Sequence, residues 1–245
     1  MALLTRGRRE PQTVEDSRMS IIEHLEALRR ALIVSLGAWA LTTIVAFFFS
    51  GRIFDFLIAR AGLKNVVFLD LTGGVILDLK VALYAGVIVA APVILQQLWW
   101  FVSPGLHIHE RRMALPMLFA TVVFFYIGTA FALFALPLFV KVLTGFAPPH
   151  AQYLPGGNEL LGFIMVIVVA FGIVFELPVV LYTLGRLGII SSRWLYKNRF
   201  YWVVGLGLAA NLLTPGVDPF TPFILFIPLW IFWEGTALLL KLSGH

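Results

Sequence analysis

The sequence predicts an all-α polytopic membrane protein with six transmembrane helices. Of its 245 residues, 60% are hydrophobic and only 13% are charged, whereas a soluble domain carries about 25% charged residues. Its mean hydropathy is +0.93. Several apolar runs reach about 20 residues, the length with which a helix crosses a bilayer core of ~30 Å. An open strand cannot satisfy its backbone in lipid, so these runs are predicted to be helices.

Four apolar runs are long enough to cross the membrane, and two more lie near the C-terminus. The fifth run is short for a bilayer core at 1.5 Å per residue. We therefore expect short fifth and sixth helices with local thinning of the bilayer; a re-entrant hairpin is the alternative. The predicted spans are 30–50, 76–98, 117–140, 159–182, 200–213 and 220–240, within one domain over residues 20–241.

The distribution of lysine and arginine indicates the orientation. Most of the 18 basic residues lie in the N-terminal tail, after the second and fourth spans, or near the C-terminus. The positive-inside rule then predicts that both termini, including a tail over residues 1–19, are cytoplasmic. This placement favours a membrane protein over a nucleic-acid-binding one, despite the net charge of +5. The basic residues predicted on the other side are Arg52, Arg60, Lys64, Lys80 and Lys141.

Three segments outside the spans are expected to be ordered. Residues Ser20 to Arg30 have apolar residues at helical spacing, which predicts an amphipathic helix in the cytoplasmic headgroup region. A plain juxtamembrane anchor is the alternative. The two long loops on the other side, Gly62 to Gly74 and Gly145 to Asn158, are predicted to form an extracytoplasmic cap.

A short polar segment, Trp99 to Arg112 (WWFVSPGLHIHERR), separates two long apolar runs. It is predicted to be a cytoplasmic loop that recognises a partner. Glu110 is a candidate acceptor for a guanidinium group, because carboxylate and arginine pair bidentately, and Phe101 would supply apolar contact. A solvated helix end with an internal Glu–Arg pair is the alternative. The two histidines of the segment are too few for a metal site.

Several polar residues fall inside predicted spans. Glu176 is the most unusual, because a carboxyl group in lipid costs ~2.5 kcal/mol or more and should face a cavity, a partner or the protein interior. Pro178 should bend the same helix. Gln97 is a candidate for interhelical hydrogen bonds, and Glu234 repeats the argument made for Glu176. Asp218 is predicted outside the membrane or at the cap of the sixth helix.

No catalytic motif is present. The sequence contains no Gly-x-Ser-x-Gly, His-Glu-x-x-His or phosphate-binding loop, and no cysteine. We therefore expect no enzymatic activity, no cofactor and no metal. An intramembrane hydrolase would lack a nucleophile–base pair. A proton-coupled small-molecule transporter that uses Glu176 is the main alternative to a receptor.

Eight short motifs resemble those of the TatC family, the multispanning receptor subunits of the twin-arginine protein translocase. The resemblance extends in order from about residue 19 to 240. The motifs are Glu23-His24-Leu25, Ala91-Pro92-Val93-Ile94, Phe101-Val102-Ser103-Pro104-Gly105-Leu106, His109-Glu110-Arg111-Arg112, Phe125-Tyr126-Ile127-Gly128, Phe171-Gly172, Phe175-Glu176-Leu177-Pro178 and Leu213-Thr214-Pro215.

The resemblance implies a concave, glove-shaped bundle of six helices in the cytoplasmic membrane of a prokaryote or in a thylakoid. It implies recognition of paired arginines in the signal peptides of folded cargo, and transport driven by the proton-motive force. The expected partners are single-span TatA- and TatB-type subunits, membrane lipid and other copies of the same chain, with no nucleic acid.

The resemblance also implies roles for individual residues. Signal-peptide binding is expected at Phe101 and Glu110. Glu176, with Gln97 as a second polar residue in the membrane, is associated with partner helices and the concave face, and Asp218 with the extracytoplasmic hairpin.

The N-terminal helix departs from the family pattern at one position. Ala27 stands where the family usually has a second acid, and Glu26 lies one position earlier. A shift of one residue rotates a side chain by ~100° on a helix. Glu23 and Glu26 are the candidate substitutes, and Glu110 is expected to carry more of the arginine recognition than in relatives with both acids.

Overall fold

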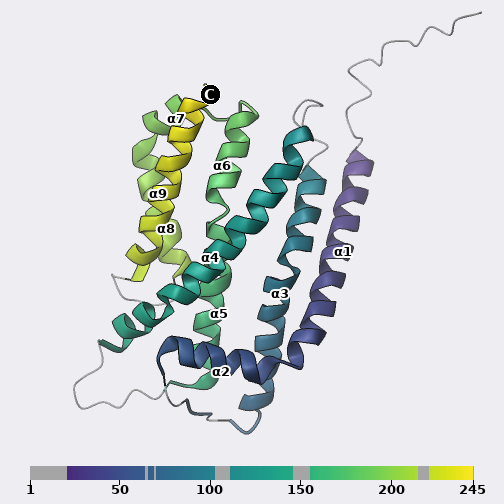
Figure 1. Cartoon of the computed structure of the whole chain (residues 1–245), viewed down its shortest axis with the longest axis vertical. Helices are drawn as coiled ribbons and strands as arrows, with labels where there is room; N and C mark the ends of the chain where they lie inside the picture. The colour runs from purple at the N-terminus through teal and green to yellow at the C-terminus, as the bar shows by residue number, and fades with distance from the viewer. Residues whose placement is uncertain are drawn as a thin grey trace, which may run out of the picture.

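The computed structural model describes residues 21–63, 66–68, 70–102, 111–145, 155–214 and 221–244. Most of these residues are helical, and the predicted all-α membrane fold is confirmed (Figure 1). Within the described residues, five helical segments are long and apolar enough to cross a membrane, and Arg199–Leu213 is a shorter apolar helix. The count of six membrane crossings stays a prediction.

Each predicted span overlaps a helix, and two short helices lie between them. The fourth predicted span is divided into α5 and α6, while α2 and α7 fall in segments that were predicted to lie outside the membrane. The helices are α1 (Ile21–Phe47), α2 (Ser50–Ala61), α3 (Gly73–Val102), α4 (Arg111–Gly145), α5 (Gly157–Val174), α6 (Leu177–Arg186), α7 (Ser192–Lys197), α8 (Arg199–Leu213) and α9 (Thr221–Leu242).

Helix α1 is one continuous helix of 27 residues. The prediction of a separate amphipathic helix up to Arg30 is wrong for the described residues, because the helix continues into the apolar run without a break. It packs along α3 (Figure 1), where Thr42 Oγ1 donates to the Gly86 carbonyl at 2.8 Å and Trp39 Nε1 donates to the Leu83 carbonyl at 3.0 Å. After Arg30, much of its remaining surface is apolar and exposed, which suits contact with lipid.

The loops after α2 and α4 meet at the lower end of the bundle in Figure 1, the end at which α2 lies across the other helices. The Val67 amide donates to the Pro155 carbonyl at 3.2 Å, and the Gly157 amide donates to the Val67 carbonyl at 2.9 Å. Arg60 of α2 reaches the Phe134 carbonyl of α4 at 3.4 Å. These contacts join the two predicted outside loops, as expected for a cap.

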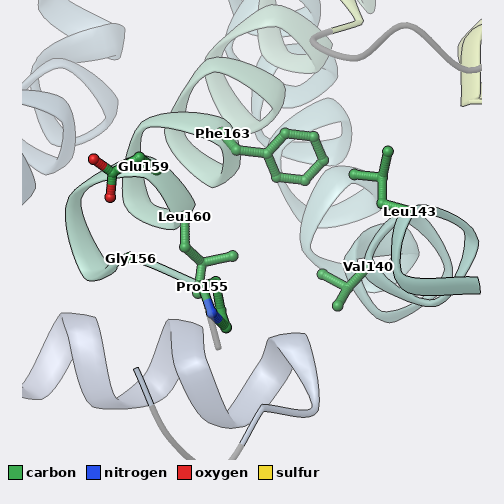
Figure 2. A pocket seen from close by; sticks show the side chains of 7 residues that line it. All are labelled: Val140, Leu143, Pro155, Gly156, Glu159, Leu160 and Phe163. Atoms are coloured by element: carbon green, nitrogen blue, oxygen red, sulfur yellow. The ribbon is translucent and has the colours of Figure 1, made fainter. Parts of the chain in front are cut away.

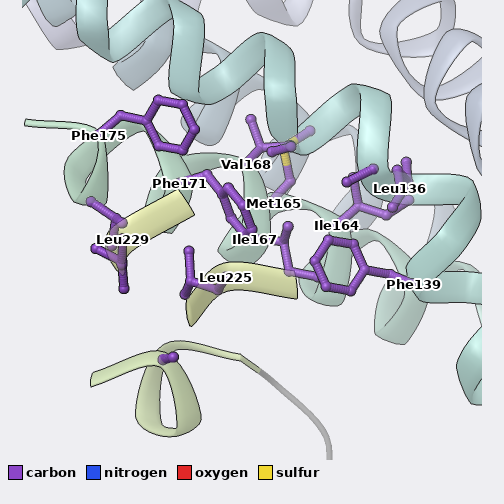
Figure 3. Packing of buried hydrophobic residues seen from close by; sticks show 14 of the residues in the cluster. Leu136, Phe139, Ile164, Met165, Ile167, Val168, Phe171, Phe175, Leu225 and Leu229 are labelled. Atoms are coloured by element: carbon purple, nitrogen blue, oxygen red, sulfur yellow. The ribbon is translucent and has the colours of Figure 1, made fainter. Parts of the chain in front are cut away.

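The core forms where α5 crosses α4. A β-carbon added at Gly128 of α4 would lie 2.8 Å from the Phe175 Cβ, and closer still to the Phe171 carbonyl oxygen. One added at Gly172 would lie 2.7 Å from the Phe125 ring. Figure 3 shows Phe171 of α5 among side chains of α4 and α9, and its ring packs edge-on against that of Phe139 at 5.9 Å. The two glycines therefore allow the backbones to approach closely.

Helices α8 and α9 form an uneven hairpin. Helix α8 has 15 residues and is short, as predicted. Helix α9 has 22 residues, which matches the predicted span 220–240 closely but is long enough to cross a bilayer core, so the expectation that the sixth helix is also short is wrong. Arg199, the first residue of α8, lies 3.6 Å from the Glu234 carboxylate, and its guanidinium lies 4.9 Å from the Trp230 ring centroid. The first residue of α8 therefore lies level with Glu234, about two turns along the helix axis from the end of α9 at Leu242. The hairpin does not reach the lower end of the bundle (Figure 1).

The α4–α5 crossing generates a stability prediction. Gly128→Ala should lower the free energy of unfolding by roughly 1–3 kcal/mol, because its methyl group would force the two backbones apart. Gly162→Ala in α5 is the matched control, since no atom lies within 4 Å of its added β-carbon. This change should stabilise the helix by about 0.5–1 kcal/mol. Unfolding of the two purified variants in detergent measures both values, and a Gly128→Ala variant as stable as wild type would contradict the close crossing.

Candidate functional site

The start of α1 and the end of α3 lie side by side at the upper end of the bundle (Figure 1). The rings of His24 and Phe101 stack there, with centroids 4.4 Å apart and an interplanar angle of 28°. Phe101 is half-buried while His24 is exposed. The packing of α1 along α3 therefore brings two predicted elements of the signal-peptide site, the N-terminal helix and Phe101, into contact.

The acids of α1 lie beside this ring stack. Glu23 and Glu26 are both exposed and, three residues apart on one helix, they are neighbours on its surface. Ala27 is half-buried and faces more toward the protein. The shift of the acid from position 27 to position 26 therefore keeps a carboxylate on the exposed side of the helix.

Two predicted site residues lie outside the described residues. Glu110 is one of residues 103–110, which connect the end of α3 to the start of α4, and Asp218 is one of residues 215–220, which connect α8 to α9. Both connections begin and end at described helices, and in the sequence Glu110 immediately precedes Arg111, the first residue of α4. The roles of both residues stay predictions.

A groove of about 250 Å³ lies between α3, α4 and α6. Its walls are mostly aliphatic, and four polar side chains interrupt them: Trp99 of α3, Thr121 of α4, Glu176 between α5 and α6, and Thr183 of α6. The residues that line it are Leu95, Leu98, Trp99, Val102, Thr121, Glu176, Val179, Val180, Thr183, Leu184 and Leu187. The predicted requirement that Glu176 face a cavity, a partner or the interior is met by this groove.

The break between α5 and α6 places Glu176 in the groove. Proline at position 178 has no amide hydrogen to donate to the Val174 carbonyl, and α5 ends at Val174. The Glu176 amide instead donates to the Ile173 carbonyl at 3.0 Å, three residues back, and the Val180 amide donates to the Glu176 carbonyl at 2.9 Å. The helix is thus interrupted where Pro178 was predicted to act, and Glu176 is the residue that precedes α6; the bend itself stays a prediction.

The Glu176 carboxyl group is only partly satisfied. The Thr121 hydroxyl hydrogen-bonds to it, and Trp99 Nε1 donates to the same hydroxyl at 2.9 Å. The Oε1 atom of Glu176 is buried and has no hydrogen-bond partner among the described residues. A buried acceptor without a partner is costly, so the groove is suited to an occupant that donates a hydrogen bond.

Neither Thr121 nor Trp99 was singled out from the sequence for this site. Threonine inside a helix commonly bonds to its own backbone, as Thr183 does to the Val179 carbonyl at 2.7 Å. A lone threonine in an apolar run is therefore a weak signal. Gln97, which was predicted, is buried with 7% exposure but is not among the residues that line the groove.

A second cavity, of about 220 Å³, lies near the lower end of the bundle, between α4 and the start of α5 (Figure 2). Its lining is apolar except for Glu159, and the carboxylate of Glu159 points away from Phe163 and Leu143. This cavity offers no inward polar group, so the groove at Glu176 and the α1–α3 end are the better candidate sites.

Comparison with known proteins gives consistent results. A model of the family described as Sec-independent protein translocase protein (TatC) matches residues 23–228. The chain is similar to the TatC proteins of Magnetococcus marinus, at 36% identity over 89% of this chain and 83% of that protein, and of Desulforapulum autotrophicum, at 37% over 94% and 87%. It is also similar to a crystal structure of the twin-arginine translocase receptor TatC, with a TM-score of 0.78 and 34% identity over 91% of this chain and 100% of that one.

The two acids predicted inside spans should respond oppositely to removal of their charge. Glu176→Leu should raise the free energy of unfolding by about 1 kcal/mol, because it removes a buried oxygen atom that has no partner among the described residues. Glu234→Leu should lower it by up to about 1 kcal/mol, because it breaks the ion pair with Arg199. Thermal unfolding in one detergent compares the two variants. A loss of stability in Glu176→Leu as large as that in Glu234→Leu would show that the Glu176 carboxyl group is fully satisfied.

Proposed function

The chain belongs to the TatC family of Sec-independent protein translocase proteins, and we propose that the ends of α1 and α3 form its binding site for twin-arginine signal peptides of folded cargo. The observation that carries this proposal is the stack of His24 on Phe101, which places the acids of α1 beside the aromatic end of α3. Guanidinium groups pair with carboxylates and stack on aromatic rings, and this end of the bundle offers both kinds of group.

Glu110 is the proposed main acceptor for the paired arginines. In the sequence, Glu110 follows Phe101 and immediately precedes Arg111, the first residue of α4. The end of α3, which carries Phe101, lies at the end of the bundle with the ring stack. Glu23 and Glu26 add negative charge that favours the arginine pair over a neutral sequence. Ion pairs of exposed acids are worth only about 0–1 kcal/mol, so Glu23 and Glu26 are proposed as secondary contributors.

The groove at Glu176 is the proposed contact for single-span TatA- and TatB-type subunits. Its aliphatic walls suit a transmembrane helix, and the Oε1 atom, which has no partner among the described residues, suits a polar side chain on that helix. The apolar segment of the signal peptide would reach the groove along α3. We further propose that the proton-motive force drives transport and that the receptor contains several copies of this chain.

The proposed location is the cytoplasmic membrane, with both termini in the cytoplasm. The upper end of the bundle carries the start of α1 with Arg29 and Arg30, the end of α6 with Arg186, and α7 (Figure 1). The upper end also has Arg193 and Lys197 in α7 and Lys241 in the last turn of α9. The lower end carries fewer basic residues: Arg52 and Arg60 in α2, Lys80 near the start of α3 and Lys141 near the end of α4. This difference supports a cytoplasmic upper end by the positive-inside rule, and the cap would then lie outside.

The alternative of a proton-coupled small-molecule transporter is not favoured, because the family model and the similar proteins are all components of a protein translocase. A transporter would also take up solute as purified protein alone, which gives a simple way to separate the two functions.

Binding of a twin-arginine signal peptide tests the proposal directly. Glu110→Gln should weaken binding of the peptide at least tenfold, about 1.4 kcal/mol, because a charge-assisted bidentate pair is replaced by a neutral contact. Glu23→Gln and Glu26→Gln should each weaken it about two- to fivefold. The measurement is the Kd of a labelled peptide for the purified protein in nanodiscs.

Two controls belong to this measurement. Glu159→Gln removes an exposed acid at the opposite end of the bundle and should leave the Kd unchanged. A peptide with two lysines in place of the arginines should bind the wild-type protein weakly. If Glu110→Gln binds the arginine peptide as tightly as wild type while the lysine peptide still binds weakly, the role given to Glu110 is wrong.

A further inference from the structure

Three side chains from separate elements form one hydrogen-bonded chain at the groove. Trp99 of α3 donates its indole N–H to the Thr121 Oγ1 at 2.9 Å, and the Thr121 hydroxyl of α4 bonds to Glu176 at the α5–α6 break. A hydroxyl has one proton to donate and lone pairs to accept. The indole N–H can only donate, so the Thr121 hydroxyl accepts from Trp99 and its own proton is available for the Glu176 carboxyl group. The hydrogen bonds therefore run from Trp99 through Thr121 to Glu176.

The Thr121 side chain is well placed to hold Glu176. It is buried, with 3% exposure, and it lies on α4, which packs against both α3 and α5. Among the described residues, Glu176 has no salt bridge, and its Oε1 atom has no hydrogen-bond partner. Hydrogen bonding by Thr121 is therefore the polar contact that orients the carboxyl group, and without it the side chain would lose a defined position in the groove.

The same chain of bonds begins in the last turn of α3, which also carries Phe101. Trp99 and Phe101 are two residues apart, so they point to different sides of the helix. Trp99 lines the groove, while Phe101 stacks on His24 of α1. A movement of this turn when a peptide binds at Phe101 must therefore move the indole that orients Thr121.

We propose that Trp99 and Thr121 are positioning residues that hold the Glu176 carboxyl group in the groove and couple its orientation to peptide binding at Phe101. This inference rests on the proposed function, because it takes the α1–α3 end as the signal-peptide site. It adds to that function a physical connection between the peptide site and the groove.

A fluorescent reporter in the groove tests the coupling. The sequence contains no cysteine, so Val180→Cys, which lies in the groove wall and is 50% exposed, accepts a polarity-sensitive dye at one position. The emission is measured in nanodiscs with and without a saturating twin-arginine peptide, and peptide binding is measured separately by anisotropy. In the otherwise wild-type protein, the peptide should shift the emission of the dye.

The substitutions separate the hydrogen bond from packing. Thr121→Val keeps the shape but removes the hydroxyl, and Trp99→Phe removes the indole N–H; each should reduce the emission shift about three- to tenfold, as expected for loss of one hydrogen bond in an apolar groove. Thr121→Ser keeps the hydroxyl and should retain the shift. Thr129→Val in the same helix is the matched control, since Thr129 is also buried and does not line the groove.

The double variant gives a second measurement. If Trp99 and Thr121 act through one chain of bonds, the two substitutions together should reduce the shift no more than Thr121→Val alone. If the two substitutions acted through independent packing effects, the fractional reductions of the emission shift would instead multiply.

The outcomes distinguish this inference from the proposed function. A wild-type shift in Thr121→Val, or a loss in Thr121→Ser equal to that in Thr121→Val, overturns the coupling while leaving peptide binding intact. Failure of the wild-type protein to bind the peptide overturns the proposed function and the coupling with it. The coupling is supported if all variants still bind the peptide and the emission shift is lost in Thr121→Val and Trp99→Phe. The shift must also be kept in Thr121→Ser and Thr129→Val.

Discussion

The missing amide hydrogen of Pro178 is the constraint on which the candidate groove depends. In lipid, every backbone carbonyl must find a donor within the protein, and a proline inside a helix removes one. The chain responds by ending α5 at Val174 and beginning α6 at Leu177. The break leaves Glu176 between the two helices and beside the wall formed by α3 and α4. Close packing of α4 on α5 through Gly128 then fixes how near Thr121 lies to that carboxyl group.

The two acids predicted inside spans illustrate two ways to manage a carboxylate in an apolar setting. Glu234 lies within ion-pair distance of Arg199, whose guanidinium also lies over the Trp230 ring. Glu176 receives the Thr121 hydroxyl, and its Oε1 atom has no partner among the described residues. The Oε2 atom of Glu234 is likewise buried without a hydrogen-bond partner among the described residues, so the two acids differ in their surroundings: a guanidinium of the same chain lies 3.6 Å from Glu234, whereas Glu176 lines a groove. This difference, which the sequence alone does not reveal, separates the structural acid from the candidate binding residue.

The sequence predicted the features that follow from local patterns. Apolar runs located the long helices, and Pro178 beside Glu176 indicated where the helix is interrupted. Features that depend on distant contacts were missed. Helix α2 is too short to be recognised from an apolar run, and it packs on α3 and α4. The hydrogen bond between Trp99 and Thr121 joins residues in different helices. The offset of the α8–α9 hairpin was also missed, because it depends on the position of Arg199 beside Glu234 in another helix. The motifs that resemble TatC supplied the signal-peptide residues, and of these the structure brings the acids of α1 to Phe101.

The burial of Ala27 explains how the arginine site can tolerate a missing acid. Position 27 is half-buried against the protein, whereas Glu23 and Glu26 are exposed. A carboxylate at position 27 would be partly desolvated, and its pairing with a guanidinium would be screened less than that of an exposed acid. Moving the acid to position 26 keeps its charge near the His24–Phe101 stack but exposes it to screening. In the proposed site, exposed α1 acids would contribute attraction of low strength. Discrimination between arginine and lysine would then depend on a bidentate carboxylate pair, the role proposed for Glu110.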